Sequence, residues 1–158
     1  MADRFRVIVT AAAILCGFSA GVATAEEQKT AIFAGGCFWC VESDFDKVEG
    51  VLSTVSGYTG GHTENPTYKS VTFTETGHYE AVRVTYDPTK VTYRTLTDYF
   101  LRHIDPTDDG GQFCARGTSY RTAIFVNGEA QKAAAAAAIA AAEAALGPVL
   151  VTPVIDAS

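Results

Sequence analysis

Hydrophobic and polar residues follow two different periods along the chain, and these periods predict its elements. Alternation or short apolar runs predict strands at residues 29–34, 51–57, 78–86, 121–126 and 149–155. Helical spacing predicts helices at residues 37–47, 92–102 and 128–146, the last of them dominated by alanine. Because strands and helices alternate and some strands follow each other directly, we expect an α+β sandwich with helices packed over a mixed sheet.

Two loops interrupt this pattern. Residues 58–68 contain three glycines or prolines and end at Tyr68, and residues 105–119 are long and polar and contain Cys114. A loop as long as the second one inside a small domain usually carries function.

The N-terminal segment has the pattern of an export signal. Arg4 and Arg6 precede an apolar stretch at residues 7–22, and residues 23–25 have the small-x-small pattern of a signal-peptidase site. We therefore expect residues 1–25 to be removed, which leaves one domain at residues 26–158 in the periplasm. An uncleaved membrane anchor is the alternative.

The charge balance excludes some partners. Removing residues 1–25 takes away two of the 12 basic residues and one of the 18 acidic ones, so the formal net charge changes from −6 to −7. No basic stripe remains to hold nucleic acid or an anionic membrane.

Three cysteines fall within residues 26–158, and two of them form a CxxC pair after the first predicted strand. Cys37 follows two glycines and would begin a helix, where the dipole favours a thiolate nucleophile. Cys40 would lie about 5–6 Å away on the same helix face and could trap an oxidised Cys37. A structural disulfide is the alternative, whereas a zinc site lacks a second pair of ligands, so we expect no metal.

Seven motifs carry a resemblance to a known family. They are GCFWC, GYTGG, NPTY, TGHYEAV, YDP, DPT and GTSYR, in this order along residues 36–121. Together they closely resemble the A type of peptide methionine sulfoxide reductase. The resemblance implies a two-layer α/β sandwich with a ferredoxin-like core.

The resemblance also implies roles for individual residues. Cys37 would attack the sulfur of a methionine S-sulfoxide while Glu80 protonates the oxygen, because oxide itself is a poor leaving group. Tyr68 and Tyr120 would hydrogen-bond that oxygen or the acid. The aromatic walls of the substrate pocket would be Phe38 and Trp39. From the strand pattern alone, Glu80 would instead face solvent like other alternating polar residues.

The resulting sulfenic acid on Cys37 would condense with a second thiol, and an external dithiol would then reduce the disulfide. Cys40 and Cys114 are both candidates for the resolving cysteine. The expected partners are oxidised methionine-containing proteins or free methionine sulfoxide, and a thioredoxin-like reductant. No organic cofactor is implied.

The chain departs from the family pattern at three places. Ala115 stands where the family usually has an aspartate, so we expect lower activity or substitution by Asp108 or Asp109. His103 is displaced by one position, and the family's C-terminal tail is largely absent, so recycling would depend on Cys40 or Cys114.

Two other functions fit part of this pattern. An exported CxxC protein could be a thiol-disulfide oxidoreductase, although Phe38 and Trp39 between the thiols would crowd a protein disulfide. A noncatalytic peptide-binding module could keep the aromatic pocket, but the presence of both Cys37 and Glu80 argues against it.

Overall fold

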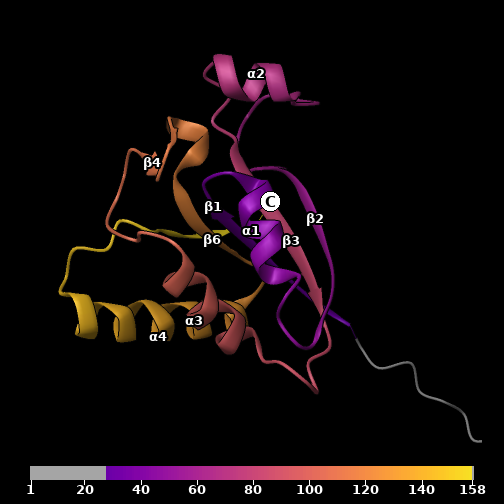
Figure 1. Ribbon diagram of the computed structural model, residues 1–158, viewed down its shortest axis with the longest axis vertical. Helices are drawn as coiled ribbons and strands as arrows, with labels where there is room; N and C mark the ends of the chain where they lie inside the picture. Colours follow the sequence, from indigo (N-terminus) through magenta and orange to yellow (C-terminus); the bar gives the residue numbers. More distant parts are fainter. Residues whose placement is uncertain (1–27, 158) are drawn as a thin grey trace, which may run out of the picture.

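The fold is built on one five-stranded sheet (Figure 1). It is taken from a computed structural model that describes residues 28–157, so the predicted export signal at residues 1–25 lies outside the described residues. The strands are β1 (Lys29–Gly35), β2 (Val51–Thr59), β3 (Tyr79–Tyr86), β6 (Thr122–Val126) and β7 (Val154–Asp156). Their order is β2-β3-β1-β6-β7, with β7 parallel to β6 and all other neighbours antiparallel. The predicted mixed sheet and α+β class are confirmed.

Helices accompany the sheet, with α1, α3 and α4 packed against one of its faces. The helices are α1 (Phe38–Phe45), α2 (Tyr68–Phe73), α3 (Tyr93–His103) and α4 (Glu129–Leu146). A hairpin of β4 (Gly111–Gln112) and β5 (Ala115–Arg116) and a 3-10 turn, η1 (Thr118–Tyr120), lie within the predicted long loop. Among residues 28–157, no helix is long and apolar enough to cross a bilayer.

Phe33 of β1 lies at the centre of the main core, between the sheet and the helices. Its ring stacks on Phe45 of α1 at 5.1 Å and on Phe100 of α3 at 4.9 Å between centroids. The opposite face of the sheet holds a smaller cluster that includes Ala34 and Phe125. The apolar area removed from water is therefore concentrated on the helix side of the sheet.

Side-chain hydrogen bonds cap the N-termini of α2 and α3. The Thr92 hydroxyl accepts the backbone N–H of Thr95 at 3.1 Å, so Thr92 is the N-cap of α3. At α2, Thr67 and Ser70 each accept the other's backbone N–H in a capping box.

The structure corrects two expectations. Helix α2 was not predicted, because it has six residues and only Val71 is buried. The last strand is shorter than residues 149–155, since prolines at positions 148 and 153 have no N–H to donate to a ladder. Instead the Val151 N–H donates to the Pro106 carbonyl at 2.8 Å, outside the sheet.

Candidate active site

Cys37 lies at the junction of β1 and α1, as predicted. Gly36 before it has a φ of +87°, and a Cβ at this position would lie 2.6 Å from the Cβ of Gln112. Only glycine allows both this conformation and this close approach. The turn therefore places the half-buried Cys37 at the N-terminus of α1, next to the β4–β5 hairpin.

Glu80 caps this helix from the neighbouring sheet. Its Oε2 accepts the backbone N–H of Phe38 at 3.1 Å, and its side chain is only 2% exposed. The expectation that Glu80 faces solvent is wrong, because it shares strand parity with the buried Val82 and Val84. The carboxyl group consequently points to the helix side of the sheet, close to Cys37.

The environment of Glu80 favours its protonated form. Burial raises the pKa of its carboxyl above the ordinary value, and the hydrogen bond from the Phe38 N–H offsets part of this effect. A carboxylic acid with a raised pKa can donate a proton closer to neutral pH, as a general acid must.

Three tyrosines lie around this carboxyl group. Tyr58 is directly opposite Glu80 in the β2–β3 pair. Burial first, and then the charge of Glu80, raise the pKa of both Tyr58 and Tyr120, and the Tyr68 side chain raises both further. The predicted Tyr68 and Tyr120 are therefore brought together with Glu80. Tyr58 was missed as a site residue, although its place in GYTGG offered a signal.

Aromatic rings extend from Cys37 along the surface. The ring of Phe38 lies 5.8 Å from that of Tyr58 and 6.0 Å from that of Trp39, measured between centroids. Trp39 is 73% exposed, so its face is open to a ligand. The structure thus places both predicted wall residues beside Cys37.

Within residues 28–157, Cys40 and Cys114 are exposed, and both are free thiols, as is Cys37. Burial raises the pKa of Cys40, followed by its hydrogen bond with the Cys37 side chain and by the charges of Cys37, Asp44 and Cys114. Among residues 28–157, no three His, Cys, Asp or Glu side chains are grouped to hold a metal ion.

The carboxylates near Ala115 have other contacts. Asp108 forms an ion pair with both terminal nitrogens of Arg116, which together with the Gly110 N–H lowers the pKa of its carboxyl. The Asp108 carboxylate is therefore paired with Arg116 of the β4–β5 hairpin. This ion pair argues against a role for Asp108 in place of the family aspartate. Asp108 and Asp109 both line a cavity that also includes Tyr79 and Arg121.

His78 anchors the loop that leads to Tyr68. Its Nδ1 accepts the Gly61 N–H at 3.3 Å, and its Nε2 lies 2.9 Å from the Thr63 carbonyl oxygen. One neutral tautomer, with the proton on Nε2, satisfies both contacts. These bonds connect the start of β3 to the loop between β2 and α2.

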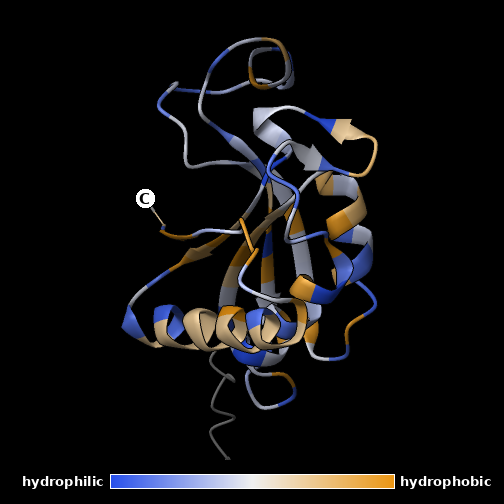
Figure 2. Ribbon diagram, turned by 90° about the vertical axis from the view of Figure 1, so that its left-hand side faces the viewer, coloured by the Kyte–Doolittle hydropathy of each residue, from blue (hydrophilic) through white to orange (hydrophobic). Residues whose placement is uncertain are grey.

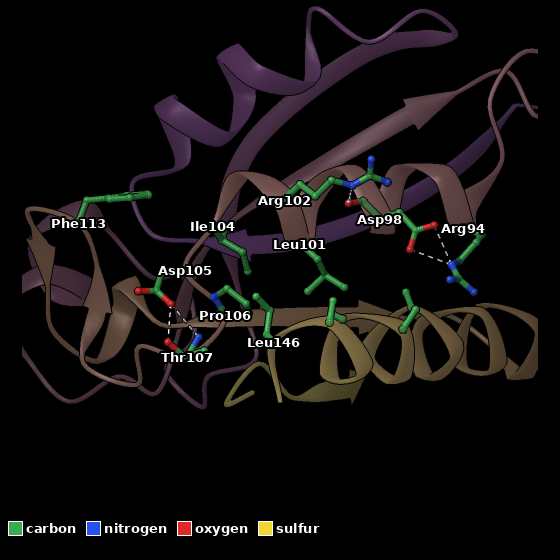
Figure 3. Close-up of a pocket in the computed structure, with 14 residues that line it drawn as sticks. Arg94, Asp98, Leu101, Arg102, Ile104, Asp105, Pro106, Thr107, Phe113 and Leu146 are labelled. Carbon is green, nitrogen blue, oxygen red and sulfur yellow. Dashed lines mark hydrogen bonds and ion pairs between the residues drawn. The ribbon is translucent and has the colours of Figure 1, made fainter. Parts of the chain in front are cut away.

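A cavity of about 750 Å³ lies elsewhere, between α3 and α4 (Figure 3). Leu101 and Ile104 form part of one wall, and Leu146 and several alanines of α4 form another. None of the predicted catalytic or substrate-binding residues lines it. We therefore place the candidate site at Cys37 and Glu80 and not in this cavity.

Comparisons with known proteins identify the family of the chain. Residues 29–157 match the family model "Peptide methionine sulfoxide reductase". The chain is 57% identical over 123 residues to "Peptide methionine sulfoxide reductase MsrA 2" of Caulobacter vibrioides, a match that covers 78% of this chain and 63% of that relative. The chain thus spans less than two thirds of the length of this relative.

Two solved structures have the same fold. The structure resembles methionine sulfoxide reductase A of Corynebacterium diphtheriae with a TM-score of 0.75 and 35% identity, over 82% of this chain and 64% of that one. It also resembles Mxr1 of Saccharomyces cerevisiae in complex with Trx2, with a TM-score of 0.62 and 23% identity, over 83% and 77%. With a family model matched over nearly all described residues, the chain belongs to the peptide methionine sulfoxide reductase family, in its A type.

Proposed function

We propose that this protein reduces methionine S-sulfoxide, free or within proteins, to methionine. The observation that carries the proposal is the position of Cys37 at the N-terminus of α1, beside a buried carboxyl group that binds the next backbone N–H. This arrangement brings a nucleophilic sulfur and a proton donor to the same point.

In the first step, the Cys37 sulfur attacks the sulfoxide sulfur. Glu80 holds the Phe38 N–H with Oε2, which leaves Oε1 to carry the proton that the sulfoxide oxygen receives. The oxygen passes to Cys37, so the products are methionine and a sulfenic acid on Cys37. Hydroxyl groups of Tyr58, Tyr68 and Tyr120 would bind the oxygen as its charge develops.

In the second step, another thiol condenses with the sulfenic acid, which forms a disulfide and releases water. An external dithiol then reduces this disulfide by thiol–disulfide exchange and is itself oxidised to a disulfide. The yeast Mxr1 complex with Trx2 supports a thioredoxin-like protein in this role. Because thiols supply both electrons, the cycle requires no organic cofactor.

Two further features belong to the proposal. The strand order β2-β3-β1-β6, with α1 and α3 in the crossovers, supports a ferredoxin-like core within a two-layer sandwich. The pattern of residues 1–25 supports export to the periplasm. N-terminal sequencing of the protein from a periplasmic fraction tests export, with a new terminus at Glu26 as the expected result.

The activity is tested with purified protein, dithiothreitol and peptides that contain either epimer of methionine sulfoxide. Turnover of the S epimer, its loss in Cys37→Ser and no turnover of the R epimer are expected. Reduction of insulin disulfides without any sulfoxide turnover would support the CxxC oxidoreductase alternative instead, since that function needs only Cys37 and Cys40.

A further inference from the structure

We propose that His78 is a positioning residue for the reduction of methionine sulfoxide. Its ring holds the loop at residues 60–67 against the segment before β3, and through this loop it fixes the place of Tyr68 near Glu80. The inference rests on the proposed function and adds to it a residue that acts without touching the substrate.

The loop at residues 60–67 connects two tyrosines of the site. Tyr58 lies near the end of β2, and Tyr68 is the first residue of α2. The sheet holds Tyr58 in place, since this residue pairs directly with Glu80 of β3. Tyr68 lies outside the sheet, so its position depends on the loop and on α2.

Helix α2 contributes little packing of its own. It has six residues, of which only Val71 is buried, and Tyr68 is 57% exposed. Figure 1 and Figure 2 show α2 at one end of the molecule, away from α3 and α4. A segment with few buried apolar contacts opens locally at a low cost in free energy. Hydrogen bonds of the loop before α2 therefore decide how firmly Tyr68 is held.

Three hydrogen bonds join this loop to the segment before β3, among the residues that the structure describes. The His62 N–H donates to the Thr76 carbonyl at 3.0 Å. The other two bonds belong to the His78 ring, whose Nδ1 accepts the Gly61 N–H at 3.3 Å and whose Nε2 lies 2.9 Å from the Thr63 carbonyl oxygen. The ring thus makes two of the three bonds and holds the loop at two points.

The His78 ring also packs directly on the loop backbone. A Cβ at Gly61 would lie 2.4 Å from the ring Cγ and Cδ2, so no larger residue fits without displacing the ring. The preceding Gly60 has a φ of +78°, and a Cβ there would lie 2.9 Å from the Phe125 ring. These two close approaches fix the distance of the loop from the sheet and from His78.

Neither ring nitrogen of His78 is free to act on a substrate. Nδ1 accepts a backbone N–H, and Nε2 donates its proton to a backbone carbonyl in the tautomer that satisfies both contacts. The ring is therefore bound to the loop on both sides. Its effect on the reaction passes through Tyr68, whose hydroxyl would bind the sulfoxide oxygen as charge develops.

His78→Phe tests this role, because it removes both hydrogen bonds and keeps a ring against Gly61. With Tyr68 held less firmly, the first-turnover rate, measured without reductant on a methionine S-sulfoxide peptide, is expected to fall about five- to tenfold. His103→Phe is the matched control. It also removes a bond from a ring nitrogen to a backbone carbonyl, that of Tyr99, and should keep the parent rate.

A double-mutant cycle shows whether the effect passes through Tyr68. Tyr68→Phe removes the hydroxyl group that His78 positions, and alone it should lower the first-turnover rate roughly tenfold. Adding His78→Phe to it should then lower the rate by less than a further twofold. A merely structural role of His78 would instead lower the rate by the same factor with and without the Tyr68 hydroxyl.

Trypsin reports on α2 without reference to activity. Lys69 follows Tyr68 and is exposed, and cleavage after it requires the helix to open locally. Cleavage at this site is expected to be about tenfold faster in His78→Phe than in the parent protein or in His103→Phe. His78→Asn should lie between them, because its amide oxygen can replace Nδ1 as the acceptor of the Gly61 N–H.

Three results would overturn the positioning role. The first is a first-turnover rate of His78→Phe within twofold of the parent rate. The second is an equal loss of rate with and without the Tyr68 hydroxyl, and the third is unchanged cleavage after Lys69.

Two other variants serve if His78→Phe does not fold. His78→Asn keeps one of the two ring bonds, and Gly61→Ala displaces the ring from the loop side. Both should change the rate and the cleavage in the same direction. No turnover by the folded parent protein would instead refute the proposed reductase function, whereas unchanged cleavage after Lys69 would refute the role of His78 alone.

Discussion

Glu80 combines a structural role with the proposed chemical one. Its carboxyl group satisfies a backbone N–H at the start of α1, from 42 positions away in the sequence. The same burial that makes this contact possible raises the pKa of the group. Stability and acidity at this position are therefore coupled, and a single substitution affects both.

Glu80→Gln should separate the hydrogen-bond acceptor from the acid. The glutamine carbonyl can still accept the Phe38 N–H but has no acidic proton, so the rate of the first turnover should fall by about 10²-fold or more. Glu42→Gln, in α1 and bonded to Thr54 of β2, is the control and should keep its activity. A first-turnover rate for Glu80→Gln within twofold of the parent rate would contradict the assignment.

The raised pKa of Glu80 also predicts how stability depends on pH. The folded state holds the Glu80 proton more tightly than the unfolded chain, whose carboxyl has the ordinary pKa of about 4.5. Its stabilising effect is therefore complete below pH 4.5 and is lost as the pH rises through the folded-state pKa.

Urea unfolding at several pH values tests this dependence with Glu80→Gln, which cannot ionise. The variant should gain stability relative to the parent protein as the pH rises and show no pH-dependent difference below pH 4.5. A difference that stays constant between pH 4 and pH 8 would show that burial does not perturb this carboxyl group.

Tyr58→Phe tests the tyrosine that was not expected from the sequence. The substitution keeps the ring contact with Phe38 and removes only the hydroxyl group near Glu80. Loss of one hydrogen bond to the sulfoxide oxygen should lower kcat/KM by roughly three- to tenfold. Tyr86→Phe, at the other end of β3, should leave kcat/KM unchanged; equal effects of the two variants would argue against a role for Tyr58.

At the scale of elements, the N-terminus of α1 is organised by contacts from two other parts of the chain. The side chain of Cys37, at the cap position, makes no capping hydrogen bond. Glu80 of β3 supplies the acceptor, and the hairpin packs on Gly36. Helix α1, which begins after Cys37, thus depends on β3 and on the β4–β5 hairpin for its position.

Gly36→Ala should disturb this junction strongly. Alanine is disfavoured at a φ of +87°, and its Cβ would collide with Gln112, so a loss of more than about 1 kcal/mol in unfolding free energy is expected. Gly57→Ala is the matched control, since no atom lies within 4 Å of the added Cβ. Urea unfolding measures the stability of both variants. A Gly36→Ala protein as stable as Gly57→Ala would show that the fold does not require the close approach of Gly36 to Gln112.

At the scale of the whole molecule, periodicity predicted the sheet and the three longer helices because these elements bury continuous apolar faces. It did not predict α2, which buries only Val71, or the short extent of β7 after Pro153. The motifs identified Cys37, Tyr68 and Tyr120, and the structure brings them to one place. The buried position of Glu80 followed from its strand parity, which the sequence showed, whereas its contact with α1 is tertiary and had no local signal.

The two faces of the sheet differ in how much stability they contribute. Phe33 and Ile32 are adjacent in β1 and point to opposite faces; Phe33 is fully buried among the rings under the helices, whereas Ile32 is partly exposed on the other face. Phe33→Ala should therefore cost about 3–5 kcal/mol in unfolding free energy, and Ile32→Ala less than half of this. If both variants lost the same unfolding free energy in urea, the face of the sheet that holds Ile32 would contribute as much stability as the face that holds Phe33. A smaller loss for Ile32→Ala would place the core that supports Cys37 and Glu80 on the helix side alone, because both residues are attached to elements that pack there.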